Sequence, residues 1–191
     1  MKRKSNYKIS PLILNRHSPR AMSGEALEKE EFMPLFESAR WAPSSFNNQH
    51  WRFVYAKRDT KYWDGFFNLL GEWNREWCKN AALLVIVISK KIFDGNGNVA
   101  KTHSFDTGAA CENLALEGSR RKLVVHAIEG FDYDLAKKLL NLSDDYQVEV
   151  MIAIGKPGKL GDLPEQYRHI ETLSDRKPLS KIVFEGEFKI G

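Results

Sequence analysis

A central sheet covered by helices on both faces is the architecture that the sequence predicts. Strand and helix patterns alternate along the chain, and this alternation is typical of layered folds of that kind. The purely apolar run in Ala82–Ser89 is typical of a strand that is buried on both sides. Within Glu25–Trp41, apolar residues at helical spacing indicate an amphipathic helix: Phe32, Leu35, Phe36 and Ala39.

The other elements are predicted from shorter patterns. Gln49–Lys57 places aromatic residues at alternate positions, which indicates a strand with one aromatic face. The segment Asp59–Lys79 is rich in aromatic residues and is expected to be helical. A loop and four further elements follow: loop Asp94–Asn98, helix His103–Arg121, strand Leu123–Ile128, helix Asp132–Leu142 and strand Gln147–Gly155.

The size and composition of the chain fit one compact domain. It has 191 residues, of which 42% are hydrophobic, and it shows no repeat or linker, so we expect residues 1–191 to form a single domain. The longest apolar run, Ala81–Ile88, is far shorter than the roughly 20 residues of a membrane-spanning helix. The basic start is followed by too short an apolar patch for a secretory signal. We therefore expect a cytoplasmic protein with no membrane partner.

The net charge argues against a nucleic-acid partner. The formal charge is +4, from 29 Lys and Arg against 25 Asp and Glu. A nucleic-acid-binding protein would concentrate its cations on one helix or interleave them with aromatic residues, and neither pattern occurs. A small anionic ligand fits a few well-placed cations better.

Several motifs with known chemistry are missing or incomplete. No G-x-G-x-x-G or G-x-S-x-G sequence occurs, which speaks against a Rossmann dinucleotide site and a nucleophile elbow. His103 and Asp106 lack a third ligand at helical spacing, so no metal site is predicted, and a solvated helix start explains them equally well. Cys78 and Cys111 show no metal-ligand spacing and are expected to be reduced and partly buried.

A cluster of cations near the N-terminus is more informative. Residues 16–20 read RHSPR, so two guanidiniums and a hydroxyl stand at alternate positions. Because Pro19 biases Ser18 away from helix, the three groups can converge on one phosphate in an extended or turned segment. Far downstream, residues 175–178 (DRKP) offer further cations. A solvated basic surface remains an equally good interpretation of either cluster taken alone.

Seven segments, considered together, resemble the flavin-dependent nitroreductase family in the same order. They span about Pro11–Val183 and read RHSPR, ARWAPSSFNNQHWRF, WCKNAALLVIV, DTGAACENLALEG, IEGFD, IAIGKPG and DRKPL. The resemblance implies a homodimeric α+β three-layer sandwich with a central mixed sheet, and FMN at the subunit interface. It also implies that the C-terminal segment, about residues 156–191, extends over the partner subunit.

The resemblance also implies a set of residues that bind the FMN phosphate and ribityl chain. By position these are Arg16, His17, Ser18, Arg20, Arg176 and Lys177. A second set resembles the segment that the partner subunit lends to the same flavin: Pro43, Ser44, Ser45, Asn47 and, less firmly, Gln49. The amide and hydroxyl side chains of PSSFNNQ match the neutral donors and acceptors of an isoalloxazine ring without burying a charge.

The ring end of the site is implied by the IEGFD segment. In the family, backbone N–H groups at the positions of Glu129 and Gly130, after Ile128, face N5 and O4 of the flavin and tune it, so no catalytic side chain is expected. Asn74 aligns loosely with a polar residue near the pyrimidine end. Two histidines depart from the pattern. His50 follows Gln49 where a small residue or proline is common, and His126 is either a core histidine, which we favour, or a neighbour of the ring.

The implied activity is that of an FMN-dependent NAD(P)H oxidoreductase. NADH or NADPH would reduce the flavin and leave, and a nitroaromatic, a quinone or a similar acceptor would then be reduced in the same place by ping-pong hydride transfer. A flavin-binding or flavin-sequestering protein without turnover is the alternative, and the sequence does not separate the two. A basic module that binds nucleic acid is a third and weaker hypothesis.

Overall fold

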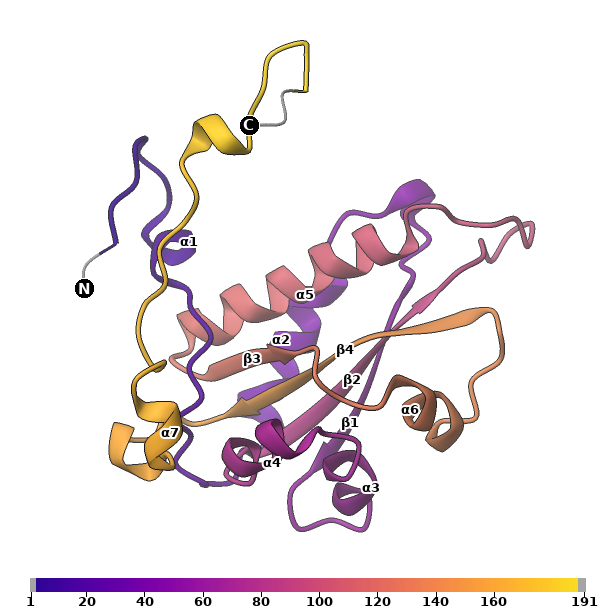
Figure 1. Ribbon diagram of the computed structural model, residues 1–191. Coiled ribbons are helices and arrows are strands. Elements are labelled where there is room, and N and C mark those ends of the chain that lie inside the picture. The colour runs from indigo at the N-terminus through magenta and orange to yellow at the C-terminus, as the bar shows by residue number, and fades with distance from the viewer. Residues whose placement is uncertain (1–2, 189–191) are drawn as a thin grey trace.

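The computed structural model describes residues 3–188, and the sheet in this part of the chain has the strand order β1-β2-β4-β3 (Figure 1). The strands are β1 (Trp51–Lys57), β2 (Leu83–Lys90), β3 (Val124–Ile128) and β4 (Tyr146–Gly155). Each lies close to the bounds predicted from the sequence. Helices cover both faces of the sheet, so the predicted α+β three-layer arrangement is confirmed.

The sheet is antiparallel, not mixed, within residues 3–188. Each neighbouring pair of strands runs in opposite directions: β1 with β2, β2 with β4, and β3 with β4. The mixed sheet implied by the resemblance is therefore wrong for these strands. β2 and β3 do run in the same direction and are joined by the crossover helix α5 (His103–Arg120), but β4 lies between them. No parallel pair can form for that reason.

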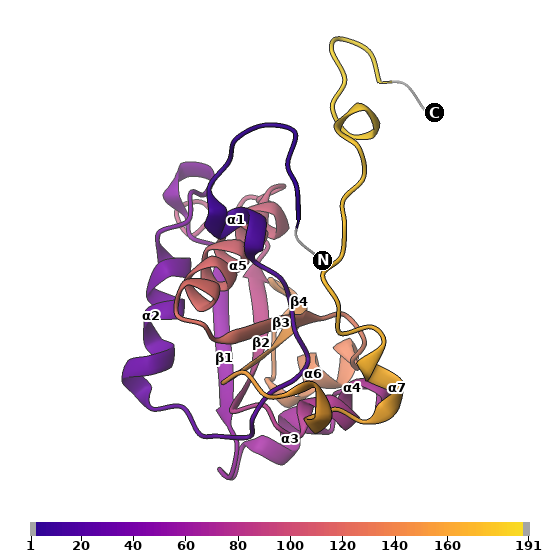
Figure 2. The ribbon, with the colours of Figure 1, turned by 90° about the vertical axis from the view of Figure 1, so that its left-hand side faces the viewer.

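The first helical layer consists of α2 (Lys29–Arg40) and α5 (Figure 2). Because side chains alternate along β2, Leu83, Val85 and Val87 point into this layer. The aromatic face predicted for β1 is confirmed here, since Phe53 and Tyr55 pack on Phe36 of α2. At the other end of α5, a Cβ at Gly118 would overlap Val125 of β3, so only glycine permits this close approach.

The second layer covers the opposite face and contains four short helices: α3 (Trp63–Phe67), α4 (Glu72–Cys78), α6 (Tyr133–Leu139) and α7 (Glu165–Arg168). They pack on Leu84, Ile86 and Ile88 of β2. The helix predicted over Asp59–Lys79 is in fact two helices. The chain breaks between them because Leu70 forms a bridge with Phe131, and the Gly71 N–H donates to the carbonyl of Gly130 at 3.0 Å.

Both ends of the described chain run along one side of this body. The N-terminal segment contains the short helix α1 (Pro11–Asn15), and the C-terminal segment contains the 3-10 turns η2 (Leu160–Asp162) and η3 (Leu179–Lys181). The last described residues of the C-terminal segment project away from the layers (Figures 1 and 2). Within residues 3–188, no helix is long and apolar enough to cross a membrane.

Candidate functional site

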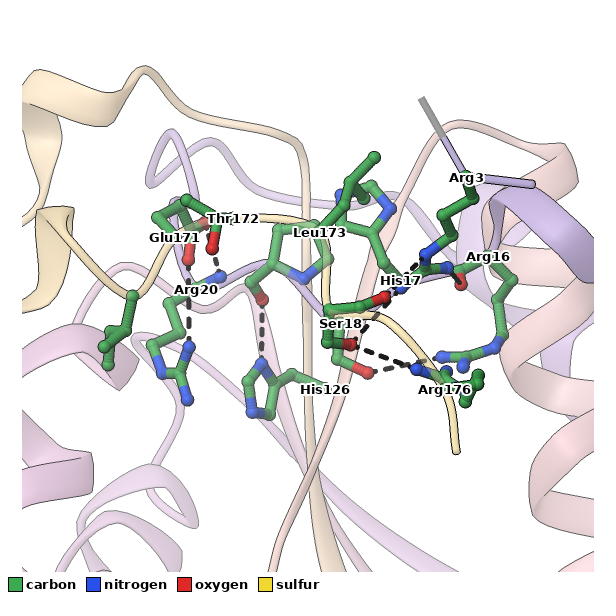
Figure 3. Close-up of a pocket in the computed structure, with 13 residues that line it drawn as sticks. Arg3, Arg16, His17, Ser18, Arg20, His126, Glu171, Thr172, Leu173 and Arg176 are labelled. Carbon is green, nitrogen blue, oxygen red and sulfur yellow. Dashed lines mark hydrogen bonds and ion pairs between the residues drawn. The ribbon is translucent and has the colours of Figure 1, made fainter. Parts of the chain in front are cut away.

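A cavity of about 360 Å³ lies where the N-terminal and C-terminal segments cross (Figure 3). Its lining comes from three parts of the chain that are distant in sequence: Arg3; Arg16, His17, Ser18, Pro19 and Arg20; His126 of β3; and Ile170, Glu171, Thr172, Leu173, Ser174 and Arg176. The family resemblance implied that the RHSPR segment and Arg176 share one ligand group, and the structure brings both to the lining of one cavity.

The charge of this cavity is strongly positive. Its lining contains four arginines and one carboxylate, that of Glu171. Glu171 is mostly committed to the backbone, because its Oε1 accepts hydrogen bonds from the N–H groups of Arg20 at 2.7 Å and Ala21 at 2.9 Å. Its Oε2 lies 3.9 Å from the Arg20 guanidinium. Among the lining residues the cations outnumber the carboxylate, as in sites that bind phosphate; one of them, Arg16, also has its Nε 3.5 Å from Oε1 of Glu112, which lies outside the lining.

Arg20 retains an unused donor inside this cavity. Its Nε is buried and has no hydrogen-bond partner among residues 3–188. The guanidinium lies over the Trp77 ring at 6.0 Å from the centroid, which holds its position without using its N–H groups. A buried charged donor without an acceptor is costly, so an anionic acceptor in the cavity would stabilise the site.

His126 closes the floor of the cavity. Its Nδ1–H donates to the carbonyl of Pro19 at 2.9 Å, and its ring packs on Trp77 with centroids 4.6 Å apart. Burial lowers the pKa of His126, and the positive charge of Arg20 acts in the same direction. The neutral form, with its proton on Nδ1, is therefore favoured. The hydrogen bond expected of a core histidine is present, but the side chain is only partly buried and lines the cavity, so both alternatives weighed from the sequence stay open.

The loop that follows β3 presents backbone donors next to a fixed amide. Asn74 Nδ2 donates to the Gly130 carbonyl at 2.9 Å, while Asn74 Oδ1 accepts from Trp77 Nε1 at 3.2 Å. The Glu129 carbonyl accepts from Phe131. Among residues 3–188, the N–H groups of Glu129 and Gly130 donate to no acceptor. Ile128, directly before them, is buried in the core, whereas Glu129 and Gly130 are exposed. The start of this loop is therefore fixed by packing, and its next two residues face solvent.

The neutral segment 43–49 forms a separate structure, the turn η1 (Ser45–Asn47). Asp106 in the first turn of α5 holds this turn, because its Oδ2 accepts from the Ser45 N–H at 2.9 Å. Asp106 is only 4% exposed, so the solvated helix start considered for it is wrong. Gln49 N–H donates to Ser44 Oγ at 3.0 Å and closes the turn from the other side.

The backbone of this turn is strained. Phe46 and Gln49 have φ angles of 52° and 51°, in the left-handed region that such residues seldom adopt. Phe46 is also 92% exposed, and the Pro43 and Asn47 side chains are exposed beside it. Strained backbone of this kind is typical of functional sites, where the surrounding structure compensates for its cost.

His50 lies directly behind the turn and is fully buried. Its Nδ1–H donates to the carbonyl of Lys90 at 2.8 Å. Its Nε2 lies 3.8 Å from Asp106 Oδ2 and has no hydrogen-bond partner in the described part of the chain. His50 therefore packs behind the turn and contacts Asn48, Lys90 and Phe93.

The predicted site residues therefore form three groups in one chain. Arg16, His17, Ser18, Arg20 and Arg176 line the cavity. Asn74, Ile128, Glu129 and Gly130 meet at the end of β3, two residues beyond His126. Pro43, Ser44, Ser45, Asn47 and Gln49 form the turn beside α5 and do not line the cavity. Lys177 is exposed and does not line it either.

Two charged residues of the cavity lining were missed at the level of sequence, together with the uncharged residues 170 and 172–174. Arg3 belongs to the basic run MKRK, which carries no positional signal, although an arginine there could have been weighed as a fourth cation. Glu171 lies in a stretch without any motif, and its role depends on the crossing of the two chain ends. Both cysteines are unpaired as predicted, and burial raises the pKa of the Cys111 thiol to about 12.

The layered α+β fold with a cationic cavity at the crossing of its two termini defines a class of ligand-binding sandwich proteins. A family model described as "Nitroreductase family" matches residues 13–70 and 66–156. The chain belongs to the nitroreductase family.

Known proteins resemble the chain over most of its length. A solved structure described as an oxidoreductase containing FMN is 39% identical, covers 98% of this chain and 96% of its own, and has a TM-score of 0.93. A Desulfovibrio desulfuricans protein in complex with FMN has a TM-score of 0.72 at 23% identity, with 95% of this chain and 100% of that one covered. "Putative NAD(P)H nitroreductase MhqN" of Bacillus subtilis (strain 168) is 24% identical, over 80% of this chain and 90% of its own.

Proposed function

We propose that the protein is an FMN-dependent NAD(P)H oxidoreductase that reduces nitroaromatic, quinone or similar electron-poor acceptors with ping-pong kinetics. The observation that carries this proposal is the cavity with four arginines against one carboxylate, in which the buried Nε of Arg20 has no acceptor among residues 3–188. The 39% identical structure described as containing FMN supports the identity of the anion. When bound, FMN would supply the hydride chemistry, and the chain supplies position and electrostatics.

The phosphate end of FMN fits the cavity. Arg16 and Arg20 present guanidiniums, and Ser18 and His17 add neutral donors beside them. Arg16 Nη1 already reaches toward Ser18 Oγ at 3.4 Å, so the two groups share one region of the cavity. Arg176 approaches from the C-terminal segment, and we assign the neighbouring Lys177 a weaker, long-range role because it is exposed.

The ring end of FMN fits the loop after β3. Donors at Glu129 and Gly130 would face the ring atoms at which negative charge develops on reduction, and such donors stabilise that charge without a catalytic side chain. Asn74 fixes the Gly130 carbonyl at 2.9 Å and so orients the loop. Displacement of this backbone is expected to impair reduction of the flavin more than substitution of the Glu129 side chain does.

We also propose that the active form is a homodimer. The turn 43–49 is separate from the cavity within one chain, so it can serve a flavin only if it reaches the cavity of a second copy. The projecting C-terminal segment exposes Ile182, Val183 and Phe188, with Phe188 77% exposed, and a partner surface would cover them. In this proposal residues 1–191 are one cytoplasmic domain whose C-terminal segment lies over the partner only beyond α7, because Leu163 and Tyr167 are buried in the core of their own chain; residues 1–2 and 189–191 are outside the described part.

The test is an absorption spectrum of the purified protein, followed by anaerobic addition of NADH and of NADPH. Flavin bands that bleach with either nucleotide support the oxidoreductase. Bands that persist with both would overturn the redox part and favour a flavin-sequestering protein. Protein that stays colourless after added FMN would overturn the flavin site as a whole.

A further inference from the structure

Arg3 occupies the centre of the junction between the two chain ends. Its Nε donates to the Ser174 carbonyl at 3.0 Å, and its Nη1 donates to the carbonyls of Leu14 at 3.1 Å and Arg16 at 2.6 Å. Its Nη2 reaches Ser174 Oγ at 3.4 Å. One side chain thus binds the backbone on both sides of the cavity, across 171 residues of sequence in the case of Ser174.

Ser174 also binds the guanidinium of Arg176. Its hydroxyl accepts from Arg176 Nη1 at 3.1 Å as well as from Arg3. Arg16 is held from the other side, because its own carbonyl is one of the acceptors of Arg3. Arg3 therefore contacts the backbone of Arg16 directly and is linked to Arg176 through the shared Ser174 hydroxyl, and all three arginines line the cavity (Figure 3).

Such an arrangement is unfavourable without an anion. Burial lowers the pKa of Arg3, and the neighbouring charges of Arg176 and Arg16 lower it further, whereas Asp175 acts in the opposite direction. The three cations therefore repel one another and are compensated only in part by Asp175 and by Glu112, whose Oε1 lies 3.5 Å from Arg16 Nε. A guanidinium has five N–H donors, and the four contacts to backbone and hydroxyl oxygens leave one that can reach an anion. The repulsion is relieved most by a doubly charged group such as a phosphate monoester.

We propose that Arg3 is a positioning residue of the anion site, which joins the two chain ends and makes the site selective for a flavin that ends in a phosphate monoester. The inference rests on the proposed flavin site. Arg3 lies outside the RHSPR and DRKP segments, and its hydrogen bonds connect the two. Arg3 acts on FMN mainly through the placement of Arg16 and Arg176.

The experiment compares FMN and riboflavin, which lacks the phosphate, as ligands of the apoprotein. In Arg3→Gln the affinity for FMN should fall roughly tenfold to a hundredfold, the usual effect of losing one charge-assisted hydrogen bond, while the affinity for riboflavin should not change. Lys4→Gln is the matched control, because it removes a charge at the exposed neighbouring position and should leave both affinities as in the wild type. An equal loss for both ligands, or no loss for FMN, would overturn the proposal.

Arg3→Lys separates the charge of this side chain from its geometry. Lysine keeps the charge but is not a planar fork and cannot span three carbonyls, so it should behave nearly like Arg3→Gln. A lysine variant that binds FMN like the wild type would overturn the positioning role. If Arg3→Gln fails to fold, Ser174→Ala removes only the shared hydroxyl and should show a smaller loss for FMN in the same direction.

Limited trypsin digestion tests the junction without any flavin. Cleavage after Arg176 should be faster in Arg3→Gln than in the wild type, and inorganic phosphate should slow it in the wild type only. Unchanged cleavage in the variant would overturn the junction. A wild-type protein that binds neither flavin but passes this digestion test would overturn the proposed function and leave Arg3 as part of a site for another phosphorylated ligand.

Discussion

The cationic cavity and the turn 43–49 are built in opposite ways. The cavity is assembled from segments as far apart as Arg3 and Ser174, and it brings together cations that repel one another. The turn is local and uncharged, and it is held by one buried carboxylate, that of Asp106, and by the hydroxyl of Ser44. The first region leaves the buried Nε of Arg20 without an acceptor among residues 3–188, whereas the second stores backbone strain.

This difference indicates two different tasks. A site assembled from repelling cations gains most when a charged ligand enters, so it should dominate the affinity. A rigid, neutral turn gains little from any one contact but loses little entropy when a ligand binds, so it is suited to orientation. Mutations in the two regions should therefore differ in size and in which ligand they affect.

The largest effect is expected from combining the two regions in a mixed dimer. Arg16→Ala/Arg20→Ala should weaken FMN binding by roughly a hundredfold or more, because two charge-assisted interactions are lost. A variant of the turn, Ser44→Ala/Ser45→Ala/Asn47→Ala, should bind FMN poorly for want of orientation. Co-expression of the two variants should restore one intact site in each mixed dimer, measured as bound flavin per dimer after tag-based separation.

That complementation depends on the two regions coming from different subunits. If each chain holds its own flavin with both regions, no mixed dimer contains an intact site and the flavin content stays low. The separated homodimers of each variant provide the baseline on the same column. Equal flavin content in mixed and parental dimers would therefore contradict the shared site.

A smaller effect is expected at the carboxylate that holds the turn. Asp106→Ala removes the acceptor of the Ser45 N–H and of Thr102 Oγ1, so stability should fall by about 1–3 kcal/mol in urea unfolding. FMN affinity should fall by roughly tenfold as the turn loses its geometry. Asp106→Asn keeps one acceptor oxygen and should recover much of both losses; an asparagine variant no better than alanine would contradict the hydrogen-bond explanation.

His126 should make the stability of the folded protein depend on pH. Because burial lowers its pKa in the folded state, the unfolded chain binds the proton more readily below about pH 6.5. The free energy of unfolding is therefore unaffected by His126 above that pH. It decreases as the pH falls below it, by at most about 1.4 kcal/mol per pH unit, because the unfolded chain takes up the proton first.

The measurement is the urea midpoint at about pH 7 and about pH 5. His126→Gln should show a smaller loss of stability on acidification than the wild type, because its side chain does not titrate. His169→Gln, at an exposed position, is the control and should keep the wild-type slope. Identical slopes in the wild type and His126→Gln would show that other groups cause the acid response.

The smallest effect separates the two cations of the DRKP segment. Lys177→Ala should lower FMN affinity by at most about threefold, or about 0.6 kcal/mol, because exposed charges interact weakly in water. Arg176→Ala should cost distinctly more, since Arg176 lines the cavity and shares Ser174 with Arg3. Equal losses in the two variants, measured by flavin fluorescence quenching, would mean that the described position of Arg176 is not the bound one.

The sequence predicted those helices and strands whose buried faces follow a regular spacing of apolar residues. The strands and α5 agree with their predicted ranges because alternating or continuous apolar residues determine which faces are buried. The break between α3 and α4 was not predictable, because it depends on the contact of Gly71 with Gly130 in the loop after β3, which is distant in sequence. An abundance of aromatic residues in Asp59–Lys79 gives no information about such a contact.

The candidate site was predictable where chemistry is repeated in a short segment. RHSPR places two guanidiniums and a hydroxyl at alternate positions, so a shared phosphate was one of two interpretations available before the fold was known, beside a solvated basic surface. Arg3 and Glu171 act only because two chain ends cross, and no local pattern records a crossing. Asp106 was placed on a solvated helix start, since its burial under the turn depends on the path of residues 43–49.

The crossing of the chain ends also determines when during synthesis the site can form. A ribosome that has released only the sheet and its helices has exposed Arg16 and Arg20 but not Glu171, Ser174 or Arg176. The chain between Arg20 and Glu171 spans 151 residues. The folded sheet between them lowers the entropy cost of bringing these two residues together. Nascent chains should therefore acquire the ligand last, so that retained cofactor reports that translation has passed the final segment of the site.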